Sequence, residues 1–234
     1  MRLKVFLGSP CYDAMEPEFV GSLLASMDML RERGHELCDW GFVRGTLPHF
    51  SRNSLVAEAM NEEADVVVQI DVDHQWRSGD LVAAIEFVGS GRADVVGFAH
   101  VTRSNQTLGG DPFVSPKMLR EPVLRAIRYA GAVYIEVQSV GAGIFVVSRR
   151  CLEQLSETAT RSRQGLPMLF KMSDDTGEDF YFCEQWKKMG GKVYCHRDAI
   201  VARIGKTTFA SSFQLAISGM PIEIEEDTAG PERE

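Results

Sequence analysis

The sequence predicts an α/β protein with a mainly parallel central sheet flanked by helices. Between residues 1 and 98, short apolar runs rich in β-branched residues alternate with longer segments whose apolar residues recur at helical spacing. The clearest run is Val66–Ile70, which is too short for a typical helix and ends at two carboxylates, Asp71 and Asp73. Strands and helices that alternate at short intervals indicate βαβ units and hence a parallel sheet.

In the first half of the chain, helix start and stop signals support this prediction. Pro17 suits the first turn of a helix, Ser51 could cap a second, and Gly34 and Gly89 are natural stops. We therefore expect strands at residues 3–7, 36–40, 66–70 and 94–98, and helices that begin near residues 17, 51 and 78.

The second half is less regular. Residues 101–122 hold three prolines and a Gly-Gly pair, which is typical of a long functional loop. A weak helix is predicted over residues 123–130. Strands are then expected at residues 133–137, 144–147, 192–195 and 199–202, with helices that follow Ser148 and Gly177.

Composition narrows the class of protein. The 234 residues carry a net charge of −8, which argues against a broad nucleic-acid-binding face. Five scattered cysteines without a C-x-x-C spacing indicate free thiols and a cytoplasmic protein, and no apolar stretch approaches the ~20 residues of a membrane span. We expect one domain over residues 1–218 and an acidic, disordered tail over residues 219–234.

The carboxylate pair at the end of the central strand indicates a metal site. In an open parallel sheet, ligands bind beyond the carboxyl ends of the strands, which is where Asp71 and Asp73 lie. The two negative charges repel each other, and Mn²⁺ or Mg²⁺ would relieve that repulsion while leaving positions for phosphate oxygens. The plainer alternative is a strand that ends in a polar turn.

Four segments, in this order, resemble the nucleotide-sugar glycosyltransferases of the GT-A fold, and in particular family-2-like members. They are the loop Gly8-Ser9-Pro10-Cys11-Tyr12, the pair Arg52-Asn53 before the strand that ends in Asp71-Val72-Asp73, the stretch Gly141-Ala142-Gly143, and Gly177-Glu178-Asp179-Phe180-Tyr181-Phe182-Cys183. The resemblance covers roughly residues 3–205. It implies a single GT-A-like, Rossmann-like domain.

The resemblance also implies an activity: a metal-dependent hexosyl- or pentosyltransferase that moves sugar from a nucleotide sugar, expected to be a UDP-sugar, to an acceptor hydroxyl. Ser9 and Tyr12 would lie against the nucleoside, and Arg52 could contact the pyrophosphate. Asp73 would bind the Mn²⁺ or Mg²⁺, and Asp71 the metal, the ribose or both.

The acids that follow Gly177 would then face the acceptor. Asp179, with Glu178 beside it, could take the proton from the acceptor hydroxyl, and the positive end of a helix would favour its charged form. The plainer alternative is that both are acids of the kind favoured in any first helical turn.

One position departs from the family. A histidine commonly follows the last core strand there and completes the metal site, whereas this chain has Arg203. Arginine has no lone pair for a metal. Either water takes that coordination position, or Arg203 contacts the donor phosphates and partly replaces the cation.

Two other functions stay open. A nucleotidyltransferase also uses paired carboxylates and a metal, although the loop at residues 8–12 lacks the glycine- and basic-rich character expected of it. A binding module that kept the fold and lost turnover is the third. The acceptor is equally open between a polysaccharide, a protein, a small molecule and a modified DNA base.

Overall fold

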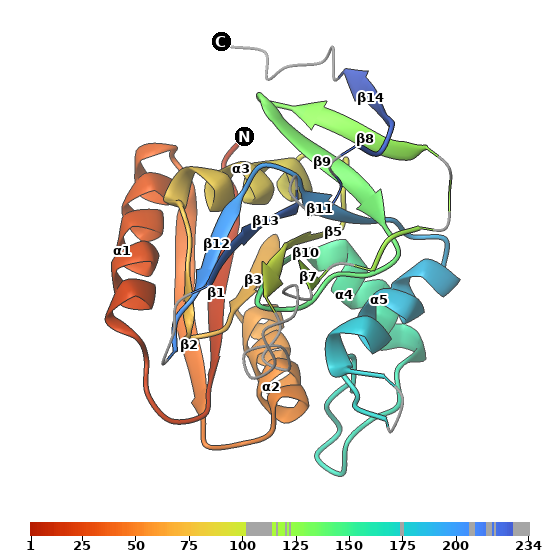
Figure 1. The fold of residues 1–234 in the computed structure, drawn as a ribbon. Coiled ribbons are helices and arrows are strands. Elements are labelled where there is room, and N and C mark those ends of the chain that lie inside the picture. Colours follow the sequence, from red (N-terminus) through yellow and green to blue (C-terminus); the bar gives the residue numbers. More distant parts are fainter. Residues whose placement is uncertain are drawn as a thin grey trace.

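The computed structural model of the chain describes residues 1–101, 114–115, 117–119, 121, 123–173, 176–205, 209–213, 217 and 219–226. In this part of the chain a nine-stranded sheet forms the centre of the molecule (Figure 1). Its strand order is β14 (Ile222–Glu226), β8 (Leu124–Tyr129), β9 (Ala132–Val137), β11 (Val193–His196), β5 (Val95–Phe98), β10 (Ile144–Ser148), β3 (Val66–Ile70), β1 (Lys4–Cys11) and β2 (Glu36–Arg44).

The sheet is mainly parallel, as the sequence predicts. β9 and β10 run antiparallel to both of their neighbours, and the other strands share one direction. Two small sheets complete the described strands. One joins β13 (Phe209–Ser212), β12 (Ile200–Arg203) and β4 (His74–Gln75), and the other joins β6 (His100–Val101) to β7 (Val114–Ser115).

Helices cover both faces of the large sheet, which makes three layers. One core contains buried residues of α1 (Pro17–Glu32) and α3 (Ser78–Gly89), and the other contains those of α2 (Pro48–Asn61), α4 (Arg149–Thr158) and α5 (Glu178–Lys188). Side chains alternate along each strand, so Val67 of β3 joins the second core while Val66 and Val68 join the first. Burial on both faces explains why β3 reads as an almost continuous apolar run.

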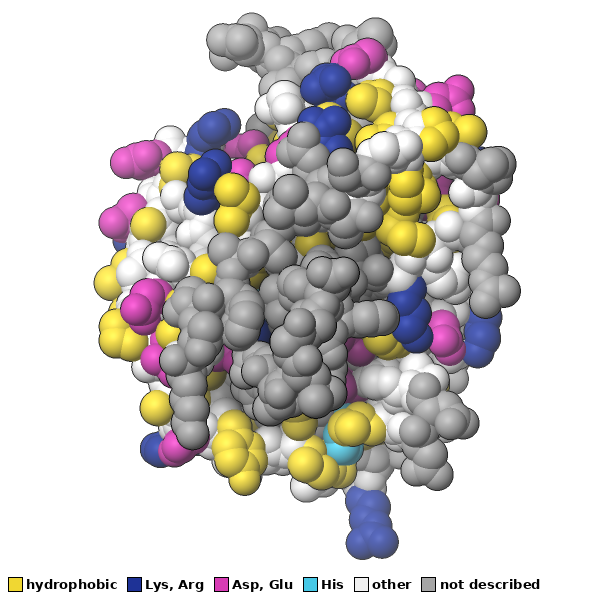
Figure 2. All heavy atoms as spheres, in the orientation of Figure 1, with side chains coloured by type: hydrophobic (Ala, Val, Ile, Leu, Met, Phe, Trp, Pro, Cys, Tyr) yellow, Lys and Arg dark blue, Asp and Glu magenta, His cyan; other side chains and the backbone are white. Residues whose placement is uncertain are grey.

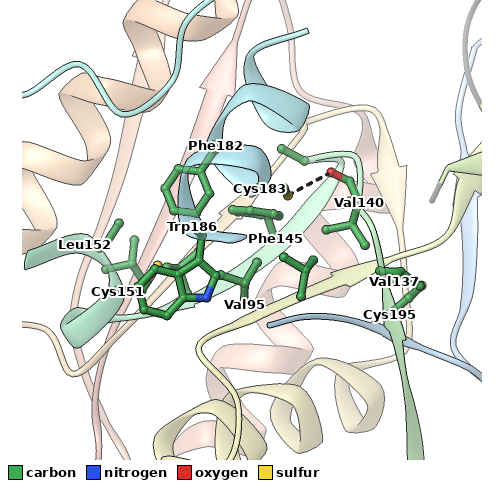
Figure 3. Packing of buried hydrophobic residues seen from close by; sticks show 14 of the residues in the cluster. Val95, Val137, Val140, Phe145, Cys151, Leu152, Phe182, Cys183, Trp186 and Cys195 are labelled. Atoms are coloured by element: carbon green, nitrogen blue, oxygen red, sulfur yellow. Dashed lines mark hydrogen bonds between the residues drawn. The ribbon is translucent and has the colours of Figure 1, made fainter. Parts of the chain in front are cut away.

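Aromatic packing fixes α5 against the sheet (Figure 3). The ring of Phe182 stacks on Phe170 at 4.7 Å between centroids and meets Phe145 of β10 edge-on at 5.3 Å. Burying one such side chain stabilises a fold by about 1.5–3 kcal/mol. The thiol of Cys183 also donates to the carbonyl of Val140 at 3.8 Å. These contacts hold the second turn of α5 against the sheet.

The predicted helix over residues 123–130 is wrong, because this segment is strand β8. Leu124 and Ala126 are buried while Arg125 between them is exposed, which is the period of a strand. β8 forms a hairpin with β9 through Ala130 and Gly131, whose φ angles are 46° and 87°. Turns of this kind require positive φ, which glycine adopts without strain.

The expected disorder of residues 219–234 is also wrong in part. Residues 222–226 form β14, which pairs in parallel with β8 at the edge of the sheet. Ile222 and Ile224 pack against the core, and this contact outweighs the acidic composition of the segment. Residues 227–234, and most of the loop expected at residues 101–122, lie outside the described residues.

Three smaller points concern the start of α2, the cysteines and the length of the helices. α2 begins at Pro48 instead of Ser51, whose side chain is buried. All five cysteines are free. Among the described residues, no helix has both the length and the apolar character that crossing a membrane requires.

Candidate active site

The carboxylate pair lies where β3 ends, beside the loop that precedes β10. The amide of Asp71 donates to the carbonyl of Gly143 at 2.9 Å, and the carbonyl of Asp73 accepts from the amide of Ile204 at 2.7 Å. The backbone is therefore fixed on both sides of the pair. The side chains of Asp71 and Asp73 are 29% and 15% exposed, so both are partly accessible to a ligand.

These residues line a cleft of about 700 Å³. Its wall is built from residues 10–14, 16, 46–48, 51–52, 71–73, 178 and 203–205. The amide of Glu16 donates to the carbonyl of Val72 at 3.1 Å, so the loop after β1 is tied to the carboxylate pair. Pockets of 300–1,000 Å³ are typical of small-molecule sites.

Part of the cleft rim is apolar. Tyr12 and Leu47, which both line the cleft, are 79% and 55% exposed, and Phe50 on the first turn of α2 is 49% exposed. Figure 2 shows hydrophobic side chains along the lower margin of the molecule, where α2 begins in Figure 1. Exposed rings at a polar cleft offer a flat surface on which a base or a sugar could stack.

Arg52 is one of two buried arginines among the described residues of the site. Its Nη2 donates to Asp71 Oδ1 at 2.7 Å, its Nε to Glu178 Oε1 at 3.4 Å and its Nη1 to Gln69 Oε1 at 3.3 Å. Burial alone would lower the pKa of Arg52, but the charges of Asp71, Glu178 and Asp179 outweigh burial and raise it. Arg52 therefore joins the end of β3 to the start of α5 and stays charged.

Asn53, the next residue, has a structural role beside it. Its Oδ1 accepts from the amides of Leu169 and Phe170 at 2.7 and 3.0 Å, and its Nδ2 donates to the carbonyl of Phe170 at 2.8 Å. Phe170 is the residue that stacks on Phe182. The Arg52-Asn53 pair thus sets the position of α5 by two routes, one ionic and one through packing.

Arg203 lies on the other side of the carboxylate pair. β12 pairs with β4, which places Arg203 opposite His74. The Nε of Arg203 donates to Asp73 Oδ2 at 3.1 Å, and the side chain is 10% exposed. Each aspartate of the pair therefore faces one guanidinium group.

His74 completes a set of donor atoms that fits a divalent cation. One ligand atom each from Asp71, Asp73 and His74 lie within 4.8 Å of one another. His74 is fully buried with its Nδ1 2.8 Å from Asp73 Oδ1, and within the described residues neither ring nitrogen makes a hydrogen bond of good geometry. Carboxylate oxygens with one imidazole suit Mn²⁺, while the carboxylates also suit Mg²⁺.

Gly143 gives His74 the room for this position. A Cβ atom at residue 143 would lie 2.7 Å from His74 Nε2 and 3.0 Å from His100 Nδ1, closer than side chains tolerate. Burial lowers the pKa of His100 to about 4, with a contribution from the neighbouring His74, so His100 is neutral at pH 7. The space beside the donor set is therefore filled by an uncharged ring.

The two acids at the start of α5 have different environments. Glu178 lines the cleft and pairs with Arg52. Asp179 accepts from the amide of Ala142 at 3.2 Å and from that of Phe180 at 2.8 Å, and it is not among the residues that line the cleft. Burial and the charge of Glu178 raise the pKa of Asp179, although both amides and Arg52 oppose the shift.

The structure brings together most of the residues that the sequence predicts for the site. Asp71, Asp73, Arg52, Glu178, Arg203 and Tyr12 all line one cleft, and Asp179 is adjacent to Glu178. Ser9 is the exception. It lies inside β1, opposite Phe42 of β2, where it is buried and its Oγ accepts from Trp40 Nε1 at 3.4 Å.

His74 is a candidate site residue that the sequence did not predict. Its signal was its position directly after Asp73, where a histidine extends the carboxylate pair into a set of three donors. The side chain is buried because residues 74–75 form β4 and pair with β12, and this long-range pairing has no local signature.

Comparison with known proteins supports the fold of this chain but does not identify an activity. No protein-family model matches the sequence, and no curated protein matches it. The crystal structure of A197 from STIV is similar over 91% of each chain, with a TM-score of 0.59 and 14% identity. That similarity shows a shared fold.

Two other solved structures are similar to this chain, with lower TM-scores. A glycosyltransferase involved in the glycosylation of the major capsid of PBCV-1 aligns with 64% of this chain and 63% of its own, with a TM-score of 0.34 and 10% identity. Residues 1–349 of TarS from S. aureus align with 83% of this chain and 57% of their own, with a TM-score of 0.45 and 13% identity.

Proposed function

We propose that this chain is a glycosyltransferase that moves a sugar from a nucleotide sugar, a UDP-sugar in the first instance, to an acceptor hydroxyl with the help of Mn²⁺ or Mg²⁺. The observation that carries the proposal is that Asp71 and Asp73 meet two arginines in one cleft of about 700 Å³, with His74 Nδ1 2.8 Å from Asp73 Oδ1. Such a site can hold both a cation and the diphosphate that the cation would neutralise.

The residues divide the work of binding between them. Asp71, Asp73 and His74 would hold the cation, which when bound neutralises charge on the departing nucleoside diphosphate. Arg203 would contact the donor phosphates, and the exposed ring of Tyr12 would stack against the base. Arg52 already donates hydrogen bonds to Asp71, Glu178 and Gln69. Its main role would therefore be to orient Asp71 and Glu178.

Transfer needs a base for the acceptor. As the acceptor oxygen forms its bond to the sugar and the bond from sugar to phosphate breaks, Asp179 would take the hydroxyl proton. Its raised pKa suits a base that must hold a proton transiently. Glu178 and Arg52 would keep the first turn of α5 beside the donor. Asp179 is also bonded to Ala142, in the 141–143 segment that contacts Asp71 and His74.

The test is a measurement of nucleoside diphosphate release from a panel of nucleotide sugars, with Mn²⁺ or Mg²⁺ and with a chelator. We expect metal-dependent release from at least one donor, and its loss in Asp73→Ala. Asp28→Ala, which alters an exposed carboxylate on α1, is the matched control.

Two other results would identify the alternatives. Formation of a nucleotide sugar and pyrophosphate from a nucleoside triphosphate and a sugar phosphate would indicate a nucleotidyltransferase. Tight donor binding without turnover in any condition would indicate a binding module.

A further inference from the structure

Arg203 lines the cleft and contacts one of the candidate metal ligands. Its Nε contacts Asp73 Oδ2 at 3.1 Å, while the other oxygen of the same carboxylate faces His74 Nδ1 at 2.8 Å. The carboxylate that a cation would use is thus shared with a positively charged side chain. A cation and Arg203 would have to occupy neighbouring positions on one carboxylate.

The local charges make this sharing unfavourable without a donor. Arg203 pairs with Asp73, and Arg52 pairs with both Asp71 and Glu178, so each aspartate of the pair already has a guanidinium group beside it. A divalent cation that joins them meets two like charges at short range in a partly buried site, where screening by water is weak. A nucleoside diphosphate would offer Arg203 another negatively charged partner in place of Asp73.

The backbone allows Arg203 to change partners without refolding. The pairing of β12 with β4 and the bond from the amide of Ile204 to the carbonyl of Asp73 fix the main chain on both sides. The long side chain of Arg203 lines the cleft, so rotation about its own bonds is sufficient to move the guanidinium group from Asp73 toward a ligand.

We propose that Arg203 makes cation binding depend on the donor. In the free protein Arg203 pairs with Asp73 and weakens cation binding. When a diphosphate enters the cleft, Arg203 turns to the phosphates and leaves Asp73 to the cation. The inference rests on the proposed function in taking a nucleoside diphosphate as the ligand. Because coupling between two binding sites is reciprocal, the cation must strengthen diphosphate binding by the same factor.

The experiment measures Mn²⁺ affinity from the free-Mn²⁺ signal in electron paramagnetic resonance, with and without UDP, after subtraction of the Mn²⁺ that UDP binds in the absence of protein. For the wild type we expect UDP to tighten Mn²⁺ binding by about 5–150-fold, the usual range of coupling between sites. Arg203→Ala should bind Mn²⁺ alone at least about 5-fold more tightly than the wild type, should bind UDP more weakly, and should lose most of the coupling.

Three further variants sharpen the result. Arg203→Met keeps the apolar stem and should behave as Arg203→Ala does, which separates charge from packing. Arg203→Lys keeps the charge and should retain part of the coupling. Arg150→Ala removes an arginine that is paired with Asp94, away from the cleft, and should leave every constant unchanged.

The outcomes separate this inference from the proposed function. Equal Mn²⁺ affinities of the wild type and of Arg203→Ala in the absence of UDP would overturn the inference, whatever the protein transfers. Coupling as strong in Arg203→Ala as in the wild type would overturn it as well. Failure of the wild type to bind any nucleoside diphosphate or nucleotide sugar would instead count against the proposed function, while the Mn²⁺ measurement without UDP would still test the competition for Asp73.

Discussion

Replacing Arg52 by methionine tests the electrostatic centre of the site. The side chain of Arg52 is 4% exposed, and its guanidinium group contacts Asp71, Glu178 and Gln69. Methionine keeps most of the stem and removes the charge, so Asp71 and Glu178 are left facing each other without their shared cation. Asp71 is 29% exposed and can regain water, whereas Glu178 is only 15% exposed.

The magnitude follows from this difference in exposure. Removing one partner of a buried ion pair costs about 3–5 kcal/mol, because the other charge stays buried without compensation. Partial access of water to Asp71 lowers that cost, so we expect Arg52→Met to lose about 3 kcal/mol of unfolding free energy. Arg52→Lys keeps a charge but cannot reach both acids in one geometry, and it should lose roughly half as much.

The assay is urea denaturation followed by circular dichroism. Adding Glu178→Gln to Arg52→Met should recover at least about 1 kcal/mol, because it removes the stranded carboxylate. Arg31→Met, which breaks an exposed pair with Asp28, is the matched control and should change stability little. A loss below about 1 kcal/mol in Arg52→Met, with the control unchanged, would refute the view that Arg52 holds β3 and α5 together.

Three other predictions follow from the same structure. Asp179→Asn should lower sugar transfer at least ~100-fold at nearly unchanged donor affinity, and transfer at the original rate would leave Asp179 a helix-start acid. Gly143→Ala should weaken Mn²⁺ binding about 10-fold or more by displacing His74, and an unchanged titration would remove His74 from the metal site. Burial lowers the pKa of His196 to about 4, and its Nδ1 accepts from the amide of Ala199 at 3.1 Å, so its neutral form is the folded one. Stability should therefore fall by up to about 3 kcal/mol as pH drops from 6.5 toward 4, and an equal fall in His196→Asn by denaturation at several pH values would contradict this.

The local sequence pattern was sufficient to predict the strands and helices whose apolar residues pack into the two cores. β3 has the predicted bounds, and α1 and α3 appear where apolar spacing and glycine stops place them. The pattern failed at residues 123–130, since leucine, alanine and arginine favour helices while the pairing of β8 with β9 and β14 decides for a strand. Gly131 was the available signal, because a glycine between two short apolar runs favours a hairpin.

The C-terminal segment over residues 222–226 is a second case in which local composition predicted the wrong structure. Its acidic composition indicates disorder, yet Ile222 and Ile224 alternate with glutamates and pack against the core once β8 offers an edge. A pattern of two apolar residues is too short to predict a strand by itself. The segment forms a strand only because the edge of β8 offers free backbone groups with which it can pair.

The candidate site could be predicted in its residue types but not in its pairings, and the reason is sequence distance. Arg52 meets Glu178 across 126 residues, and Asp73 meets Arg203 across 130. Both contacts depend on strand placement: β10 lies beside β3 and brings the 141–143 segment to Asp71, while β12 lies beside β4 and brings Arg203 to Asp73. The resemblance to GT-A glycosyltransferases draws attention to Arg203, because a metal-binding histidine is common at that position in the family. Only the fold shows that the arginine contacts the carboxylate itself. With the proposed function, that contact predicts that changing residue 203 alters cation binding and donor binding in opposite directions.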